Sequence, residues 1–278
     1  MATTTAAAAT PPVGPSAFAR EMRRRRSLRR MSQLELATSA GTTQRHLSFI
    51  ESGRSTPGRA MVVRLAESLG LTLRERNSLL LSAGYAPMYA ESARDADSIE
   101  PAMTALRSIL TGHLPYPAVV AGPRGELVLA NAAFDVLTEG AAAHLLAPPV
   151  NVLRLALHPQ GMGPRVVNLA AWGRHITEGL RGRALAHPDP ELDDLIVELS
   201  GYLPAAAPAG DGHLGFAVPL RLRTADGELR LLTTLTSFAT AVDVTLAELH
   251  LEAFLPADAA TCELLRRREE ARKPAAGR

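Results

Sequence analysis

A short segment of the chain gathers polar side chains that can recognise the edges of base pairs. Between positions 43 and 49 it has threonine, glutamine, arginine, histidine, serine and phenylalanine, with one leucine among them. Glutamine can form two hydrogen bonds with adenine, arginine can form two with guanine, and an aromatic ring can contact the methyl group of thymine. The candidates for base contact are Thr43, Gln44, Arg45, His46, Ser48 and Phe49.

Residues on either side of this segment suit contacts with the phosphate backbone of DNA. Ser32 and Gln33 would begin the preceding helix, where free backbone N–H groups attract anions. Arg54 follows the segment and is a second kind of phosphate candidate. Seven arginines lie between positions 20 and 30. We interpret them mostly as a solvated helix face, with some close enough to phosphates to steepen the salt dependence of binding.

Five predicted helices between residues 16 and 83 must position these side chains. Glycines stand where helices would end, and two patterns of Ser or Thr followed three residues later by Glu predict capping boxes. These are Gly41, Gly53, Gly70 and Gly84, with Ser32 and Glu35, and Thr72 and Glu75. Thr43 suits the N-cap of the base-contacting helix. Helical spacing predicts a core of Leu34, Ala37, Leu47, Ile50, Val62, Leu65, Ala66 and Leu69.

The two parts of the chain differ in charge. Residues 1–90 contain 13 arginines and 5 glutamates, whereas residues 91–278 contain 17 basic and 23 acidic residues. The formal net charge of +2 for all 278 residues hides this difference. A basic part joined to an acidic part favours binding of a polyanion by the first part only.

The second part of the chain mixes strands with helices. The pattern predicts a helix over 99–111, strands over 117–121 and 126–130, and a helical stretch over 131–202 broken by prolines. A flexible loop is expected over 204–212. Strands are then expected over 214–223, 228–239 and 244–255, the first two joined by a turn that ends in Asp226 and Gly227. A charged helix is expected from about 257. This order predicts an antiparallel sheet with helices over one face.

Several classes of protein lack support in the sequence. The eight histidines are scattered without metal-ligand spacing, Cys262 is the only cysteine, and neither a phosphate-binding loop nor a Gly-x-Ser-x-Gly motif is present. We therefore predict no catalytic site, no metal and no cofactor. No apolar run approaches the roughly 18–20 residues that span a bilayer, and the first residues lack a secretory signal pattern. The expectation is a soluble cytoplasmic protein.

The N-terminal part resembles the lambda-repressor/Cro class of helix-turn-helix, the XRE family. The family's Ser-Gln-x-x-Leu-Ala pattern is here 32–37, Ser-Gln-Leu-Glu-Leu-Ala, and its Ile-Glu-x-Gly ending is here 50–53, Ile-Glu-Ser-Gly, followed by Arg54. The resemblance covers about 20–84. It implies that Arg26 in the first helix pairs with Glu51 at the end of the recognition helix, in a structural role.

Residues 99–270 resemble the MmyB-type ligand-binding domain, a PAS-like sensor found behind this kind of helix-turn-helix in bacterial regulators. The resemblance is carried by residues 117–120, 131–134, 151–155, Trp172, 243–249 and 254–258. It implies a regulator that senses a small, largely apolar molecule, with fatty-acid-like compounds as candidates. The expected fold is two-domain, an all-α five-helix helix-turn-helix domain followed by an α+β PAS-like domain, an antiparallel sheet with a helical insert. The predicted segments are a disordered tail 1–14, the DNA-binding domain 15–85, a linker 86–98, the ligand-binding and dimerisation domain 99–271, and a disordered tail 272–278.

Four side chains in the second domain are candidates for ligand contact. Arg154 and His158 lie four residues apart on a predicted helix and would share a face, where they could hold a carboxylate or other polar head. Trp172 and His175 lie three apart on the next helix and could line the same cavity. The alternative for Trp172 is a place in the core, and for Arg154 an ion pair with an acidic neighbour.

These observations predict a bacterial regulator that binds operator DNA as a homodimer and whose affinity changes with an apolar ligand. Two alternatives stay open. One is a DNA-binding adaptor or antitoxin-like protein whose second domain binds a protein partner, or a helical bundle that binds protein rather than DNA. The other is an enzyme fused to a DNA-binding domain, which the absence of an acid–base or nucleophile pattern disfavours.

Overall fold

The computed structural model describes residues 16–204 and 217–272, and it divides the chain into two compact units, Met1–Ala90 and Glu91–Arg278. The division falls within the segment 86–98 that was predicted to be a linker. The predicted tail 1–14 and most of the predicted tail 272–278 and loop 204–212 lie outside the described residues. Arg272 is the last residue of a helix, where its guanidinium pairs with Asp135 at 2.8 Å.

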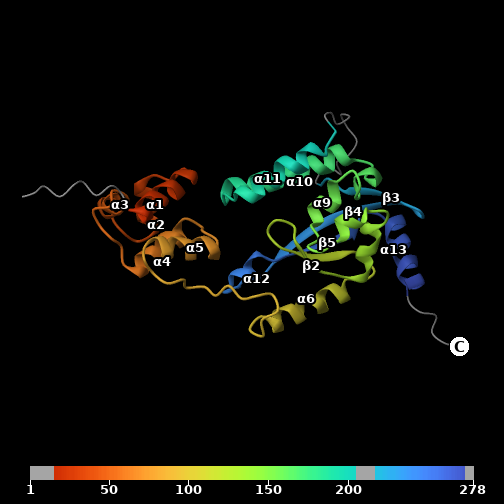
Figure 1. Ribbon diagram of the computed structural model, residues 1–278, viewed down its shortest axis with the longest axis horizontal. Coiled ribbons are helices and arrows are strands. Elements are labelled where there is room, and N and C mark those ends of the chain that lie inside the picture. The colour runs from red at the N-terminus through yellow and green to blue at the C-terminus, as the bar shows by residue number, and fades with distance from the viewer. Residues whose placement is uncertain (1–15, 205–216, 273–278) are drawn as a thin grey trace, which may run out of the picture. The chain divides into compact units, whose positions relative to one another are not determined.

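From residue 16 onward, the first unit contains five helices, as predicted (Figure 1). They are α1 (Ala17–Leu28), α2 (Gln33–Ser39), α3 (Gln44–Glu51), α4 (Arg59–Ser68) and α5 (Leu73–Ser82). Both predicted capping boxes are present, at the starts of α2 and α5. The side chain of Thr43 accepts a hydrogen bond from the His46 backbone at 3.2 Å and so caps α3. The four predicted glycines follow helix ends with positive φ, which a residue with a side chain adopts at a cost.

The core of this unit matches the predicted positions with one exception. Leu36, Leu47, Ile50 and Leu65 are fully buried. Leu34 was predicted to join them but is 58% exposed. Because α2 begins at Gln33, its inward face carries Leu36 and the alanines at 37 and 40, and Leu34 lies on the outward face.

The second unit contains a five-stranded antiparallel sheet in the order β2-β1-β5-β4-β3. Its strands are β1 (Ala118–Ala121), β2 (Leu127–Ala130), β3 (Leu220–Thr224), β4 (Gly227–Ser237) and β5 (His250–Pro256). β3 and β4 form the predicted hairpin, with Thr224 paired to Gly227. The last strand of the chain, β5, lies in the middle of the sheet, between β1 and β4.

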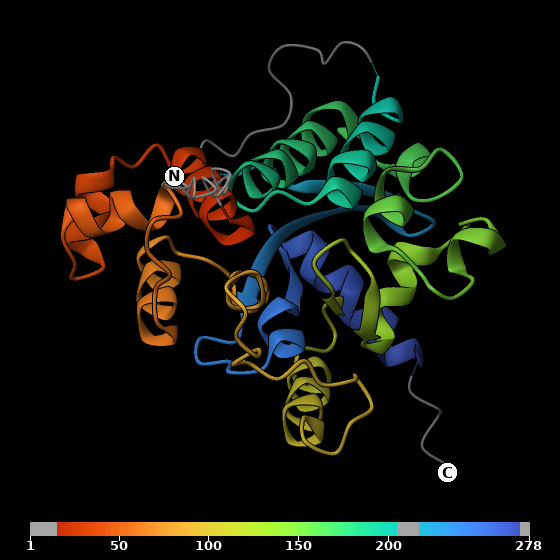
Figure 2. The same cartoon turned by 60° about the vertical axis from the view of Figure 1, so that its left-hand side comes forward.

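Helices cover both faces of the sheet, so the expectation of a single covered face was wrong. Helix α6 (Glu100–Gly112) packs on the face that carries Val120, Leu251 and Ala253. The opposite face carries Val119 and Phe254 and packs against a helical insert (Figures 1 and 2). The physical reason is that every residue of β1 is buried, which requires apolar partners on both sides.

The insert between β2 and β3 is helical, as predicted, and prolines stand at or near several of its breaks. Its elements are the 3₁₀ turn η1 (Ala132–Phe134), α7 (Asp135–Thr138), α8 (Ala143–Leu146), α9 (Val152–Leu157), η2 (Gly163–Arg165), α10 (Leu169–Ala186) and α11 (Pro190–Gly201). The final helix is α13 (Ala259–Arg272).

The segment 244–255, predicted to be one strand, is a helix followed by a strand. Helix α12 (Val244–Glu248) begins at Asp243, whose side chain accepts a hydrogen bond from the Leu246 backbone at 3.2 Å. An aspartate at this position favours a helix start, and this local signal was missed. β5 then begins at His250.

The chain on either side of the division between the units is held by hydrogen bonds. On one side, the Asn77 amide donates to the Tyr89 carbonyl at 2.8 Å and its oxygen accepts from the backbone of Met88 and of Tyr89. On the other side, the Ser92 backbone donates to Asp243, and the Ser92 carbonyl accepts from the Thr245 hydroxyl at 2.7 Å. Within the predicted linker, Tyr89 is therefore hydrogen-bonded to the first unit and Ser92 to the second, with two residues between them.

Candidate functional site

Helix α3 separates its buried residues from its polar candidates for base contact. Leu47, Ile50 and Glu51 face the core of the first unit. Gln44 and Arg45 are exposed, as is the capping Thr43, whereas His46, Ser48 and Phe49 are half-buried. The helix is thus anchored on one side and presents polar side chains on the other, as a helix that enters the major groove must.

Two contacts order the candidate side chains on α3. The Arg45 guanidinium carbon lies 5.4 Å from the centre of the Phe49 ring, in a cation–π arrangement. His46 Nδ1 lies 2.9 Å from the Thr42 hydroxyl. These contacts limit the directions in which Arg45 and His46 can extend before any ligand is bound.

A buried carboxylate fixes α3 to the rest of the first unit. Glu51 is 3% exposed, and it accepts hydrogen bonds from Arg26 Nε at 2.6 Å and Arg26 Nη2 at 2.9 Å. The Gln33 amide donates to the same carboxylate at 2.8 Å. The pair of Arg26 and Glu51 implied by the resemblance is therefore present. Burial by itself would raise the pKa of Glu51, but the hydrogen bonds from Arg26 and Gln33 outweigh it and hold the pKa below its ordinary value.

The predicted phosphate contacts have different surroundings. Ser32 is exposed, and its hydroxyl accepts a hydrogen bond from the Glu35 backbone at 3.1 Å. The Gln33 amide faces Glu51, so this residue supports α3 from the start of α2. Arg54 is exposed just after the end of α3. Contact with DNA by these three residues remains a prediction.

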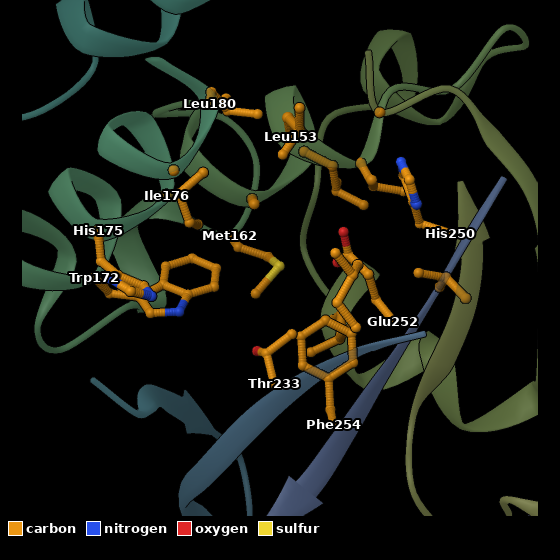
Figure 3. Close-up of a pocket in the computed structure, with 18 of the residues that line it drawn as sticks. Leu153, Met162, Trp172, His175, Ile176, Leu180, Thr233, His250, Glu252 and Phe254 are labelled. Carbon is orange, nitrogen blue, oxygen red and sulfur yellow. The ribbon is translucent and has the colours of Figure 1, made fainter. Parts of the chain in front are cut away.

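The second unit encloses a cavity of about 520 Å³ between the sheet and the helical insert. Its wall is mainly apolar, with side chains from α9, α10 and β5 and from the turn before η2 (Figure 3). They include Leu153, Met162, Trp172, Ile176, Leu180 and Phe254. The volume lies within the range of about 300–1,000 Å³ that is typical of small-molecule sites.

A few polar side chains interrupt this apolar wall. His250 and Glu252 come from β5 and Thr233 comes from β4, while His175 and Arg183 come from α10. Burial raises the pKa of Glu252 above its ordinary value, and the nearby positive charge of Arg183 offsets only part of this effect. The pKa of His250 is lowered, first by burial and then by the same arginine. Sparse polar groups in an apolar cavity can orient a ligand.

Of the four predicted ligand contacts, Trp172 and His175 line the cavity and Arg154 and His158 do not. Trp172 is also part of the core around the cavity, so its two interpretations coincide. The Arg154 guanidinium instead makes two hydrogen bonds of 2.8 Å to Glu198. This arrangement corresponds to the alternative of an ion pair with an acidic neighbour.

The expectation that Arg154 and His158 share a helical face was wrong. Helix α9 ends at Leu157, and His158 has extended backbone geometry. The ring of His158 packs against Tyr202, with ring centres 4.8 Å apart. Both side chains nevertheless belong to one cluster outside the cavity, because the Tyr202 hydroxyl donates at 2.7 Å to the Glu198 carboxylate that pairs with Arg154.

The polar residues of the cavity were missed at the level of sequence. His250, Glu252 and Phe254 alternate with the apolar Leu251 and Ala253. An acidic residue at an inward position of a central strand is unusual, and this was the available signal. This signal did not identify a site, because 244–255 was predicted to be one continuous strand whose position in the sheet was unknown.

Comparison with known proteins identifies both units. The family described as the MmyB-like transcription regulator ligand binding domain matches residues 102–267, which is more than half of the chain. A helix-turn-helix family matches residues 22–76. The chain therefore belongs to the MmyB-like family, and it is a DNA-binding transcription regulator with a ligand-binding domain.

Solved structures add two distant similarities. The restriction-modification controller protein C.AhdI from Aeromonas hydrophila is 25% identical over 22% of this chain and 91% of its own length, with a TM-score of 0.21. An RNA-binding light-oxygen-voltage receptor is 17% identical over 92% of this chain, with a TM-score of 0.28, and the chain spans 64% of that receptor. No curated protein matches the chain.

Residues 16–204 and 217–272 contain neither a cluster of metal ligands nor a membrane-spanning helix. No group of three or more His, Cys, Asp or Glu side chains there is placed to hold a metal ion. None of the helices in the same ranges combines the length and apolarity that a membrane crossing requires.

The buried pair on α3 makes a stability prediction. Replacing Arg26 by alanine leaves the Glu51 carboxylate buried without its cation, and we expect a loss of about 3–5 kcal/mol of stability in the first unit. Arg24→Ala is the matched control, because Arg24 pairs with Glu21 on the exposed surface of the same helix. Its loss should be about 0.2–1 kcal/mol.

Hydrogen exchange at the α3 amides, read by mass spectrometry on the full chain, measures this difference. Exchange in β5 serves as an internal reference, since the second unit should be unaffected. Similar protection of α3 in the two variants would contradict the assigned role of Arg26.

Proposed function

We propose that this chain is a bacterial regulator that binds a specific operator through α3 and whose affinity for that operator is changed by an apolar small molecule. The observation that carries the proposal is the apolar cavity of about 520 Å³ in the same chain as a helix with an anchored face and a polar face. The membership of both units in their families supports it.

In this proposal α3 enters the major groove with its N-terminal end first. Gln44 and Arg45 contact base edges, while Thr43, His46, Ser48 and Phe49 complete the surface of contact. Ser32, Gln33 and Arg54 contact phosphates and set the position of the helix on the duplex. A homodimer would place two copies of α3 on half-sites about 34 Å apart, one turn of DNA.

The ligand acts by favouring one of two arrangements of the protein. A molecule that binds better to the DNA-competent arrangement raises operator affinity, and one that binds better to the other arrangement lowers it. The effect is reciprocal, because operator DNA must change ligand affinity by the same factor.

The DNA contacts can be separated by mutation. We expect Gln44→Ala and Arg45→Ala to lose about 1–3 kcal/mol of discrimination at particular base pairs, because each removes hydrogen bonds to a base edge. Arg54→Ala should instead weaken binding to all sequences and reduce the slope of log affinity against log salt by about one.

The measurement is fluorescence anisotropy with labelled DNA from upstream of the gene, set against random DNA across a salt series. Systematic single-base substitutions in the bound sequence locate the lost discrimination. If all three variants lost equal affinity for specific and random DNA, the assignment of Gln44 and Arg45 would fall. Unselective binding by the unmutated chain, together with a stable protein partner, would favour an adaptor instead.

Filling the cavity should uncouple the ligand from the operator. Gly179 on α10 lines the cavity, and a Cβ added there meets no atom within 4 Å. We expect Gly179→Trp to weaken ligand binding by about tenfold or more, since a bulky ring occupies part of the space. Operator affinity without ligand should persist.

Gly201→Trp provides the matched control. Gly201 ends α11, has equally open space around its Cβ, and does not line the cavity. Both variants are measured by calorimetry with dodecanol as the probe and by operator anisotropy with and without it. Equal ligand affinity in the two variants would show that the cavity is not the binding site.

A further inference from the structure

The polar groups of the cavity include an acceptor without a partner. The Glu252 carboxylate makes no hydrogen bond or ion pair with any described residue, and it points into the space bounded by Met162, Leu153 and His250 (Figure 3). His250 stands two residues earlier on β5, and its Nδ1 is buried without a hydrogen-bond partner. A buried polar group without a partner is costly, so this end of the cavity favours a ligand that forms hydrogen bonds with these two side chains.

Arg183 does not satisfy this carboxylate. Its guanidinium donates a hydrogen bond to the Pro123 carbonyl, in the turn between β1 and β2. It lies close enough to attract Glu252 electrostatically but forms no ion pair with it. The positive charge of Arg183 therefore attracts Glu252 without a hydrogen bond to it. The oxygens of the Glu252 carboxylate stay available to a donor in the cavity.

The composition of the cavity defines the ligand that would satisfy it. The apolar wall from Trp172 to Leu180 accommodates a hydrocarbon body. At the other end, a carboxylate head would place a second acidic group beside Glu252 and would offer it no donor. A hydroxyl head would donate its one hydrogen to Glu252 and could accept a hydrogen bond from His250 Nδ1 where that nitrogen carries the proton. An amine head has more than one hydrogen, so it would donate to Glu252 and, in the other tautomer of His250, to Nδ1 as well.

We infer that the cavity takes an apolar molecule that ends in a hydrogen-bond donor, an alcohol or an amine, and that Glu252 accepts this donor. The inference rests on the proposed function, since it concerns the same cavity and names the class of its ligand. A hydrogen bond to the ionised carboxylate would also offset the effect of burial, which raises the pKa of Glu252.

The test compares dodecanol, dodecylamine and dodecanoate, which share one hydrocarbon chain and differ only in the head group. Each is titrated into the full chain below its aggregation limit, and binding is followed by calorimetry. We expect the alcohol and the amine to bind about tenfold or more tightly than the carboxylate.

Variants at Glu252 connect this preference to the residue. Glu252→Leu should weaken alcohol and amine binding by about tenfold and leave the carboxylate unchanged or tighter. Glu252→Gln should retain the alcohol, because the amide oxygen still accepts a hydrogen bond, and should lose the amine, because the charge is gone. Glu178→Leu is the matched control, because Glu178 is an exposed carboxylate on α10 that does not line the cavity, and this variant should keep the unmutated preference.

The outcomes distinguish a failure of the head-group inference from a failure of the proposed ligand-binding function. Dodecanoate binding most tightly, or Glu252 variants with the unmutated preference, would overturn the head-group inference and leave the apolar cavity as the ligand site. Binding of none of the three probes by a folded chain would overturn the proposed ligand-binding function and the inference together. Circular dichroism and hydrogen exchange in β5 establish that each variant is folded.

Discussion

The central position of β5 is the constraint on which the second unit depends. Its two edges are paired with β1 and β4, and its two faces are covered by α6 and by the helical insert, so each of its side chains faces either α6 or the cavity side. The alternation from His250 to Phe254 obeys this rule, with Leu251 and Ala253 packed against α6. The same geometry places a carboxylate and an imidazole at the edge of an apolar cavity. A shift of one residue in the register of β5 would bury these polar groups against α6 and expose apolar ones to the cavity.

The first unit depends on a different kind of interaction, a buried ion pair. Glu51 is costly to bury, and its charge is stabilised only while Arg26 and Gln33 donate to it. These three residues come from α3, α1 and α2, so the pair joins the helices that define the orientation of α3. The polar face of α3 can then be varied for recognition without changing the contacts that hold the helix.

Local signals in the sequence predicted most of the first unit and parts of the second. The caps at Ser32, Thr43 and Thr72, and the glycines after the helices, act through neighbouring residues and are visible in a single sequence. The exposed Leu34 was missed because Leu34 and Leu36 fit a helical pattern equally well until the start of α2 is known. The ligand cavity required more, because the order of the strands and the packing of α6 depend on residues far apart in the chain. His250 and Glu252 were therefore unassigned until β5 was placed between β1 and β4.

The anchoring of Ser92 has a mechanical consequence for the chain. Its backbone is bound to Asp243 and Thr245, and α12 leads directly into the strand that carries His250. Before it, Tyr89 is bound to Asn77 in the other unit, so only positions 90 and 91 lie between the two attachments. A span of two residues allows only a short distance between its two attached ends. The Cα atoms of Tyr89 and Ser92 can therefore lie no more than about 10–11 Å apart, whatever orientation the two units adopt.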